Sequence, residues 1–182
     1  MPKIVSVFGG SAPRPGTPAY ESARQMGALL ARAGWTVATG GYTGVMEAAS
    51  RGASEAGGHV IGVTCALIEN WREGFRANEW VKEEIKYASL RDRLYHLVDF
   101  CDAAIALPGG IGTLSEIALT WSLLQTGEIK DKPLVVVGQV WSETLLTFVR
   151  EADGYLRPGD AARLRVAAGL DDAVKIISAS NQ

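Results

Sequence analysis

Short runs of apolar, often β-branched residues alternate with longer amphipathic segments along most of this chain. The runs predict strands, and the segments between them have helical spacing. The predicted strands cover residues 4–8, 36–39, 60–63, 103–107, 134–137 and 165–168. The predicted helices cover residues 18–33, 45–56, 113–125, 142–151 and 171–178. Strands that alternate with helices form a parallel sheet through right-handed crossovers. We therefore expect an α/β fold, a doubly wound Rossmann-like parallel sheet with helices on both faces, in a single domain over residues 1–182.

One segment, residues 64–89, interrupts this alternation. It carries Trp71, Phe75 and Trp80 among many charged residues and shows no clear period. Aromatic side chains in a polar segment are typical of surfaces that bind a ligand or another subunit. We expect this excursion either to cover a site or to form a subunit contact.

Composition narrows the classes of function. The chain has 182 residues, of which 47% are hydrophobic, so it can fill a core, and its net charge of -2 offers no basic surface for nucleic acid or membrane. Cys65 and Cys101 lie far apart, and His59 and His96 are isolated, so we expect neither a disulfide nor a protein-built metal site. The apolar run after Lys3 is too short for a signal peptide or a membrane span, which predicts a cytoplasmic location.

Three of the predicted strands end in a pair of glycines: Gly9-Gly10, Gly40-Gly41 and Gly109-Gly110. The carboxyl ends of parallel strands meet at one edge of a sheet, and open α/β folds bind ligands there. Glycine lets the backbone approach a ligand closely, and the free N–H groups of a following helix attract an anion. A tight turn without a ligand would explain one such pair, but three on the same edge favour a phosphate site.

Two familiar nucleotide motifs are missing. No GxGxxG follows the first strand, and the second strand ends in Thr39-Gly40, where a dinucleotide site has a ribose-binding acid. The Walker pattern GxxxxGK[ST] is also absent. These absences disfavour a dinucleotide cofactor and hydrolysis of a nucleoside triphosphate by a P-loop.

The carboxylate of Glu116 has two possible roles. Thr113 followed three residues later by Glu116 fits a capping box, in which the glutamate only reaches back to the backbone at the start of a helix. A carboxylate beside the phosphate turn can instead hold ribose hydroxyls or stabilise positive charge on a sugar ring. The pattern alone leaves both roles open.

Two arginines border an apolar stripe on a further predicted helix, whose stripe residues are Leu90, Leu94, Leu97 and Val98. Arg91 and Arg93 fall on the two sides of this stripe. Such arginines can bury their stems and offer guanidinium groups to an anion. The alternative is a pair of surface arginines bound to Asp92, Asp99 or Asp102.

The third glycine turn extends into a nine-residue motif. Residues 108–116 match PGGxGTxxE throughout, which is the motif of the Lonely Guy phosphoribohydrolases, a family long mislabelled as lysine decarboxylases. The resemblance covers residues 3–156, and residues 9–11 and 40–46 are similar to the family's first and second loops. It implies hydrolysis of the N-glycosidic bond of a nucleoside 5'-monophosphate, of the AMP or cytokinin riboside monophosphate type, to free base and ribose 5-phosphate.

The resemblance also implies roles for individual residues. Counting back from Pro108 by the family's spacing gives Arg93, which implies Arg93 and Glu116 as the catalytic pair. The implied substrate and phosphate contacts are Gly10, Ser11, Gly41, Gly44, Met46, Gly109, Gly110, Gly112 and Thr113. The resemblance implies no cofactor and no metal. It implies a small nucleotide monophosphate as ligand and a homodimer or homotetramer with the site near a subunit interface.

Two departures from the family pattern keep a second function open. Arg93 is followed by Leu94 where a lysine is usual, and Glu47 follows Met46 where a glycine is common. These features are more similar to a sister branch that resembles a carrier of the molybdenum cofactor, a pterin phosphate. A carrier would keep the phosphate loops and would not hydrolyse its ligand.

Overall fold

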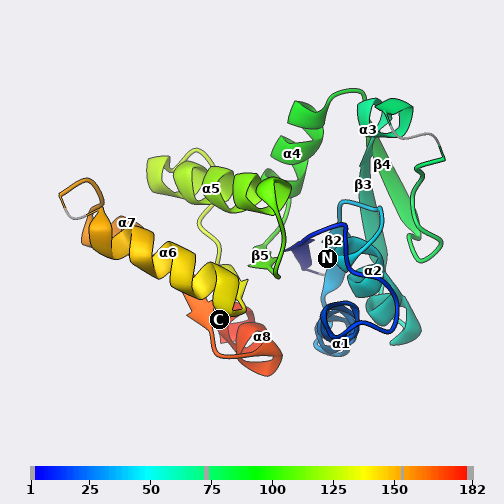
Figure 1. Ribbon diagram of the computed structural model, residues 1–182, viewed down its shortest axis with the longest axis horizontal. Helices are drawn as coiled ribbons and strands as arrows, with labels where there is room; N and C mark the ends of the chain where they lie inside the picture. Colours follow the sequence, from blue (N-terminus) through cyan, green and yellow to red (C-terminus); the bar gives the residue numbers. More distant parts are fainter. Residues whose placement is uncertain (1–2, 72–73, 153, 180–182) are drawn as a thin grey trace.

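A parallel sheet forms the centre of the protein in a computed structural model that describes residues 3–71, 74–152 and 154–179 (Figure 1). Its seven strands follow the order β4-β3-β2-β1-β5-β6-β7, and every neighbouring pair is parallel. The strands are β1 Ile4–Phe8, β2 Thr36–Thr39, β3 Val60–Cys65, β4 Glu83–Tyr87, β5 Ala103–Ala106, β6 Leu134–Val137 and β7 Leu164–Ala167. The predicted doubly wound α/β fold is confirmed.

Helices cover both faces of this sheet. They are α1 Pro18–Arg32, α2 Val45–Glu55, α3 Ala66–Trp71, α4 Leu90–Asp99, α5 Ile111–Thr126, α6 Gln139–Glu151, α7 Pro158–Ala161 and α8 Leu170–Ala179. Apolar residues of α1, α2 and α8 pack on one face, and those of α4, α5 and α6 pack on the other. The strands are buried on both sides, because their side chains alternate between the two clusters, which explains their continuous apolar sequences.

The strand order reverses between β1 and β5. The chain leaves β1 towards β2 and β3 on one side, and later returns to add β5, β6 and β7 on the other. At such a switch point the connections after the two central strands diverge and leave a crevice at their carboxyl ends. The glycine turns after β1 and β5 lie at this crevice.

The segment 64–89 contains regular structure that its sequence does not predict. It forms α3 and the edge strand β4, which pairs with β3 from Ile61↔Glu83 to Cys65↔Tyr87. The sequence pattern assigns no helix or strand to this segment. Strand β4 carries three charged residues among its five, because an edge strand needs apolar side chains on one side only.

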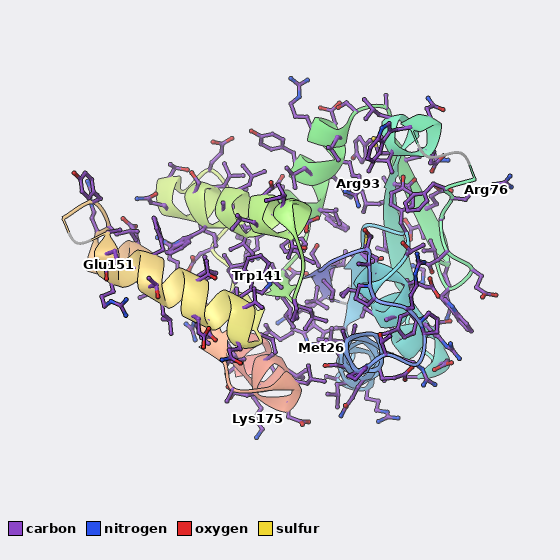
Figure 2. The ribbon with its side chains drawn as sticks, viewed as in Figure 1. Met26, Arg76, Arg93, Trp141, Glu151 and Lys175 are labelled. Carbon is purple, nitrogen blue, oxygen red and sulfur yellow. The ribbon has the colours of Figure 1, made fainter. Side chains whose placement is uncertain are left out.

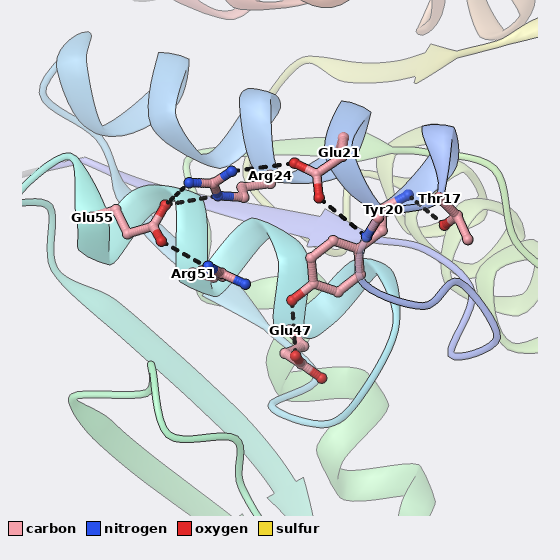
Figure 3. A network of polar contacts seen from close by, with 8 residues as sticks. Thr17, Tyr20, Glu21, Arg24, Glu47, Arg51 and Glu55 are labelled. Atoms are coloured by element: carbon pink, nitrogen blue, oxygen red, sulfur yellow. Dashed lines mark hydrogen bonds and ion pairs between the residues drawn. The ribbon is translucent and has the colours of Figure 1, made fainter.

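Helices α1 and α2 pack unusually closely. A Cβ atom on Gly27 would clash with the backbone carbonyl of Ala49, so small residues are needed where the two backbones touch. Across the outer side of this contact, Arg24 and Arg51 both bind Glu55, at 2.6 Å and 2.8 Å (Figure 3). Exposed ion pairs of this kind contribute little to stability. A Cβ atom on Gly52 would likewise clash with the carbonyl of Arg24, so the backbone contact explains the small residues of α2.

Glu47, which departs from the family pattern, has a structural role in the same helix pair. The hydroxyl of Tyr20 donates a hydrogen bond of 2.8 Å to the Glu47 carboxylate (Figure 3). Burial, together with this hydrogen bond, raises the pKa of Tyr20 to about 12. Glu47 also lies in the first turn of α2, where the helix dipole favours a negative charge. Its presence after Met46 therefore has an explanation apart from any ligand.

Candidate active site

The turns after β1 and β5 contact each other through their backbones. The N–H of Gly10 donates to the carbonyl of Pro108 at 3.1 Å. A Cβ atom on Gly109 would clash with Oγ1 of Thr113 and lie 2.7 Å from the nitrogen of Gly10. Glycine is therefore required at this point because the two turns touch, and Thr113 is buried beneath them.

The turn after β2 joins the same cluster. The N–H of Val45 donates to the carbonyl of Gly10 at 2.8 Å, and the hydroxyl of Thr43 donates to that of Ser11 at 3.2 Å. Gly44 has φ +73°, and a Cβ atom there would lie within 2.6 Å of the Ser11 backbone. The prediction that the three glycine turns share one edge of the sheet is confirmed.

The start of α5 presents free backbone groups at this edge. The helix begins at Ile111, and Gly110 is the N-cap without a side chain to cap the helix. A Cβ atom on Gly110 or on Gly112 would meet nothing within 4 Å. The first turn of a helix has unpaired N–H groups and a positive dipole end, which together bind anions. The space beside these glycines is therefore suited to a phosphate.

The capping box predicted for residues 113–116 does not form. Thr113 is the third residue of α5 rather than its N-cap, so Glu116 lies in the second turn. The sequence Gly110-Ile111-Gly112 looks like part of the turn, but the helix already includes Ile111 and Gly112. This result removes the capping-box explanation of Glu116.

Arg93 reaches from α4 to the backbone of the neighbouring strand ends (Figure 2). Its Nε donates to the carbonyl of Val63 at 2.8 Å, and its Nη2 donates to that of Gly40 at 3.1 Å. Only 6% of Arg93 is exposed, and a Cβ atom on Gly40 would clash with Nη2. The positive charge is therefore held in one place behind the second glycine turn.

The two arginines of α4 have different environments. Arg91 is largely exposed and contacts Asp92 at 3.4 Å, as expected for a surface ion pair. Arg93 is buried and makes none of the expected aspartate contacts among the described residues. It also lies 4.0 Å from the sulfur of Met46 and stacks over the ring of Tyr42, 5.7 Å from its centre.

Glu116 faces this buried charge from α5. Loss of solvent around its carboxyl group raises its pKa to about 7, and the positive charge of Arg93 opposes the rise. A group with this pKa is present in both protonation states near neutral pH, which suits proton transfer. The structure therefore brings Arg93 and Glu116 into electrostatic contact beside the three glycine turns.

Two residues that the sequence analysis missed hold these turns in place. The side-chain amide of Asn78 donates to the carbonyls of Gly41 and Tyr42 at 2.9 Å and 3.0 Å. The indole of Trp141 donates to the carbonyl of Leu107, next to the third turn, at 2.8 Å (Figure 2). Neither residue belongs to a motif, because each reaches its partner only after distant segments pack together. Asn78 also shows that segment 64–89 supports the site.

The described residues contain no group of three or more His, Cys, Asp or Glu side chains that would hold a metal ion. None of the helices in the described ranges is long and apolar enough to cross a bilayer. The groups that the structure brings together at this edge are backbone N–H groups, the buried guanidinium of Arg93 and the carboxyl group of Glu116.

Comparison with known proteins gives a consistent family. Residues 2–155 match the family model described as the SLOG cluster4 family. The cytokinin riboside 5'-monophosphate phosphoribohydrolase of Rhodococcoides fascians is 31% identical, with 97% of this chain and 89% of the relative covered. The enzyme of the same name from Mycobacterium tuberculosis is 32% identical, with coverages of 88% and 86%. The molybdenum cofactor binding protein of Rippkaea orientalis superposes with a TM-score of 0.78 at 26% identity, covering 100% of this chain and 99% of that one.

Proposed function

This chain belongs to the SLOG cluster4 family and is a homologue of the Lonely Guy phosphoribohydrolases, and we propose that it hydrolyses nucleoside 5'-monophosphates. The bond broken is the N-glycosidic bond, and the products are the free base and ribose 5-phosphate. The observation that carries this proposal is the carboxyl group of Glu116, with its pKa near 7, beside Arg93 and the glycine turns. The relatives' names support a substrate of the cytokinin riboside monophosphate type, and we include AMP because it has the same adenine-type base.

The glycine turns bind the phosphate in this proposal. The N–H groups at the start of α5, from Gly110 to Thr113, face the space that accepts it. Gly10, Ser11, Gly41, Gly44 and Met46 line the neighbouring turns, and Gly109 lets the first and third turns meet. Holding the substrate by its non-reacting end directs binding energy to the orientation of the sugar.

Glu116 acts on the reacting part of the substrate. Cleavage of a glycosidic bond passes through a state with positive charge on the sugar ring, which a nearby carboxylate stabilises. Water attacks the anomeric carbon and loses a proton. The base leaves with the electrons of the broken glycosidic bond and takes up a proton. Glu116 is the group that can accept the proton of the water, and Arg93 keeps enough of it ionised to do so.

A second candidate function is binding without hydrolysis. The likeness to the molybdenum cofactor binding protein extends over the whole chain, and the same phosphate site would accept a pterin phosphate as cargo. A carrier would need no group with a pKa near 7, which is why we favour the enzyme. A pterin that copurifies with the protein would favour the carrier.

We also propose that the protein is a cytoplasmic homodimer or homotetramer. Exposed apolar side chains on α5 and α6 support a subunit contact; they are Ile111, Leu114, Val140, Leu146 and Phe148. Ile111 and Leu114 lie next to the phosphate turn, so such a contact would border the site.

Release of free base tests the proposed reaction. The purified protein is incubated with AMP, GMP, CMP, UMP and an isopentenyl-AMP analogue, and the free base is measured by chromatography. We expect adenine-type bases from the wild type and none from a Glu116→Gln control. A wild-type protein that releases no base from any of these substrates would contradict hydrolysis and favour the carrier.

Two glycines of the third turn should respond differently to alanine. Gly112→Ala adds a methyl group in open space, so the free energy of unfolding should stay the same or rise by up to about 1 kcal/mol. The methyl group enters the phosphate space, so KM should rise by at least about tenfold. Gly109→Ala should instead lower the thermal midpoint, because its Cβ clashes with Thr113. Equal KM values for wild type and Gly112→Ala would place the phosphate elsewhere.

A further inference from the structure

A cavity lies at the edge of the sheet opposite the glycine turns, where β1, β5, β6 and β7 begin. Its volume is about 600 Å³, which falls within the range of small-molecule sites. Five basic residues line it: Lys3, Lys130, Lys132, Arg163 and Arg165. Only two acidic residues, Asp102 and Asp131, line it as well. A protein with a net charge of -2 thus has one strongly positive hollow, far from the glycine turns.

Part of this charge has a structural purpose. The ammonium group of Lys132 is buried and donates to the carbonyls of Val98 and Asp99 at 3.0 Å and 2.7 Å. These carbonyls lie at the end of α4, where a cation offsets the negative end of the helix dipole. Lys132 therefore belongs to the fold and is not available to a ligand.

Both acidic residues of the cavity are also occupied. The carboxylate of Asp102 accepts the N–H of Ile4 at 2.9 Å. The carboxylate of Asp131 accepts from Nη1 of Arg163 at 2.7 Å. The Asp131 carboxylate is paired with Arg163, and within the described ranges neither carboxylate makes an ion pair with Lys130 or Arg165.

Two cationic side chains in the cavity have no partner among the described residues. The exposed side chains of Lys130 and Arg165 make no hydrogen bond or ion pair with any other residue that the structure describes. Arg163 is different, because its guanidinium group is paired with Asp131 at 2.7 Å and with Asp160 at 3.9 Å.

The chemistry of the lining limits the class of ligand. Two guanidinium groups and an ammonium group match the oxygens and the double charge of a phosphate. No aromatic side chain lines the cavity, so nothing in it would stack on a nucleobase. Cys101 also lines the cavity. Burial raises the pKa of its thiol, which keeps the group protonated and unreactive.

We propose that this cavity is a second anion site, which binds a small phosphorylated metabolite without an aromatic base. The site is separate from the glycine turns and uses none of the residues of the proposed reaction. It would therefore exist whether the protein is a hydrolase or a carrier.

Two probes test the site: inorganic pyrophosphate and fructose 1,6-bisphosphate, titrated at low ionic strength into the ¹⁵N-labelled protein. We expect amide shifts at residues 130–133 and 163–165 with either probe, because both carry the phosphates that the cations bind. Tighter binding of the bisphosphate would identify a sugar phosphate as the ligand, and tighter binding of pyrophosphate would identify an inorganic one.

A pair of double variants provides the control. Lys130→Ala/Arg165→Ala should weaken binding by at least about tenfold, while Lys82→Ala/Lys175→Ala, which removes the same charge from exposed positions elsewhere, should change it little. The amide spectrum itself reports whether each variant is folded. Equal affinity in the two double variants, shifts confined to the glycine turns, or no shift with either probe would overturn the proposal.

Discussion

Glu116→Gln should lower the rate of base release by about a thousandfold, with little change in KM. The amide keeps the shape of the side chain but carries no charge and accepts no proton, and a loss of this kind typically costs 10²–10⁴ in rate. The phosphate contacts are at the start of α5 and stay intact, so substrate still binds. Steady-state kinetics with AMP would measure both effects. Full activity in this variant would show that Glu116 has no part in the reaction.

The same substitution should lower activity but make the protein more stable than the wild type above pH 7. The pKa of Glu116 rises from its ordinary 4.5 to about 7 in the folded protein, so the folded state binds the proton more tightly than the unfolded chain. Ionisation therefore destabilises the fold, and the free energy of unfolding should fall between pH 4.5 and 7 by up to about 3 kcal/mol. Urea unfolding at pH 5 and pH 8 should show this loss in the wild type and not in Glu116→Gln.

A distant glutamate separates these effects from those of charge alone. Glu128→Gln removes an equal charge from an exposed position just past the far end of α5 and should leave both activity and its pH dependence unchanged. The wild-type rate should rise with pH through about 7, because the ionised carboxylate is the active form. A rate that falls across this range would indicate that Glu116 acts as an acid.

Arg93→Ala should impair both stability and activity. The variant loses donors to the carbonyls of Val63 and Gly40 and a buried stem, which should cost about 3 kcal/mol of unfolding free energy. The rate should fall by about 10²–10³. Without the positive charge, the pKa of Glu116 should rise further above 7, so the midpoint of the pH–rate curve should move to higher pH.

Arg91→Ala is the matched control for this prediction. Its side chain is exposed and contacts only Asp92 among the described residues, so stability should change by less than about 0.5 kcal/mol. Arg93→Lys keeps the charge, but its side chain cannot reach both carbonyls. Compared with Arg93→Ala, it should therefore reverse more of the shift in the pH–rate curve than of the loss in unfolding free energy. If Arg91→Ala and Arg93→Ala had equal effects on the rate, the assignment of Arg93 would be wrong.

The sequence predicts most of the sheet because its central strands are buried on both faces and therefore continuously apolar. Five of the observed strands coincide with such runs to within two residues at each end, and β7 is displaced by one. The edge strand β4 was not predicted, because three of its five residues, Glu83, Glu84 and Lys86, are charged. Its position depends on pairing with β3, which local sequence does not encode.

The sequence likewise predicts some features of the candidate site and misses others. The convergence of the glycine turns follows from the geometry of parallel sheets, so the sequence predicts it. The burial of Arg93 does not follow, because helical spacing places it on the border of a stripe and says nothing of the carbonyl groups it meets. The start of α5 was also missed, since Gly112 is as compatible with a turn as with the first turn of a helix.

The charged sequence of β4 has a consequence for the behaviour of the protein at high concentration. The outer side of this strand offers unpaired backbone groups, as every sheet edge does, and an apolar strand there would recruit strands from other molecules. Glu83, Glu84 and Lys86 would each have to lose water if a second chain paired alongside. The residues that hide β4 from sequence analysis thus protect the protein against growth of its sheet into aggregates.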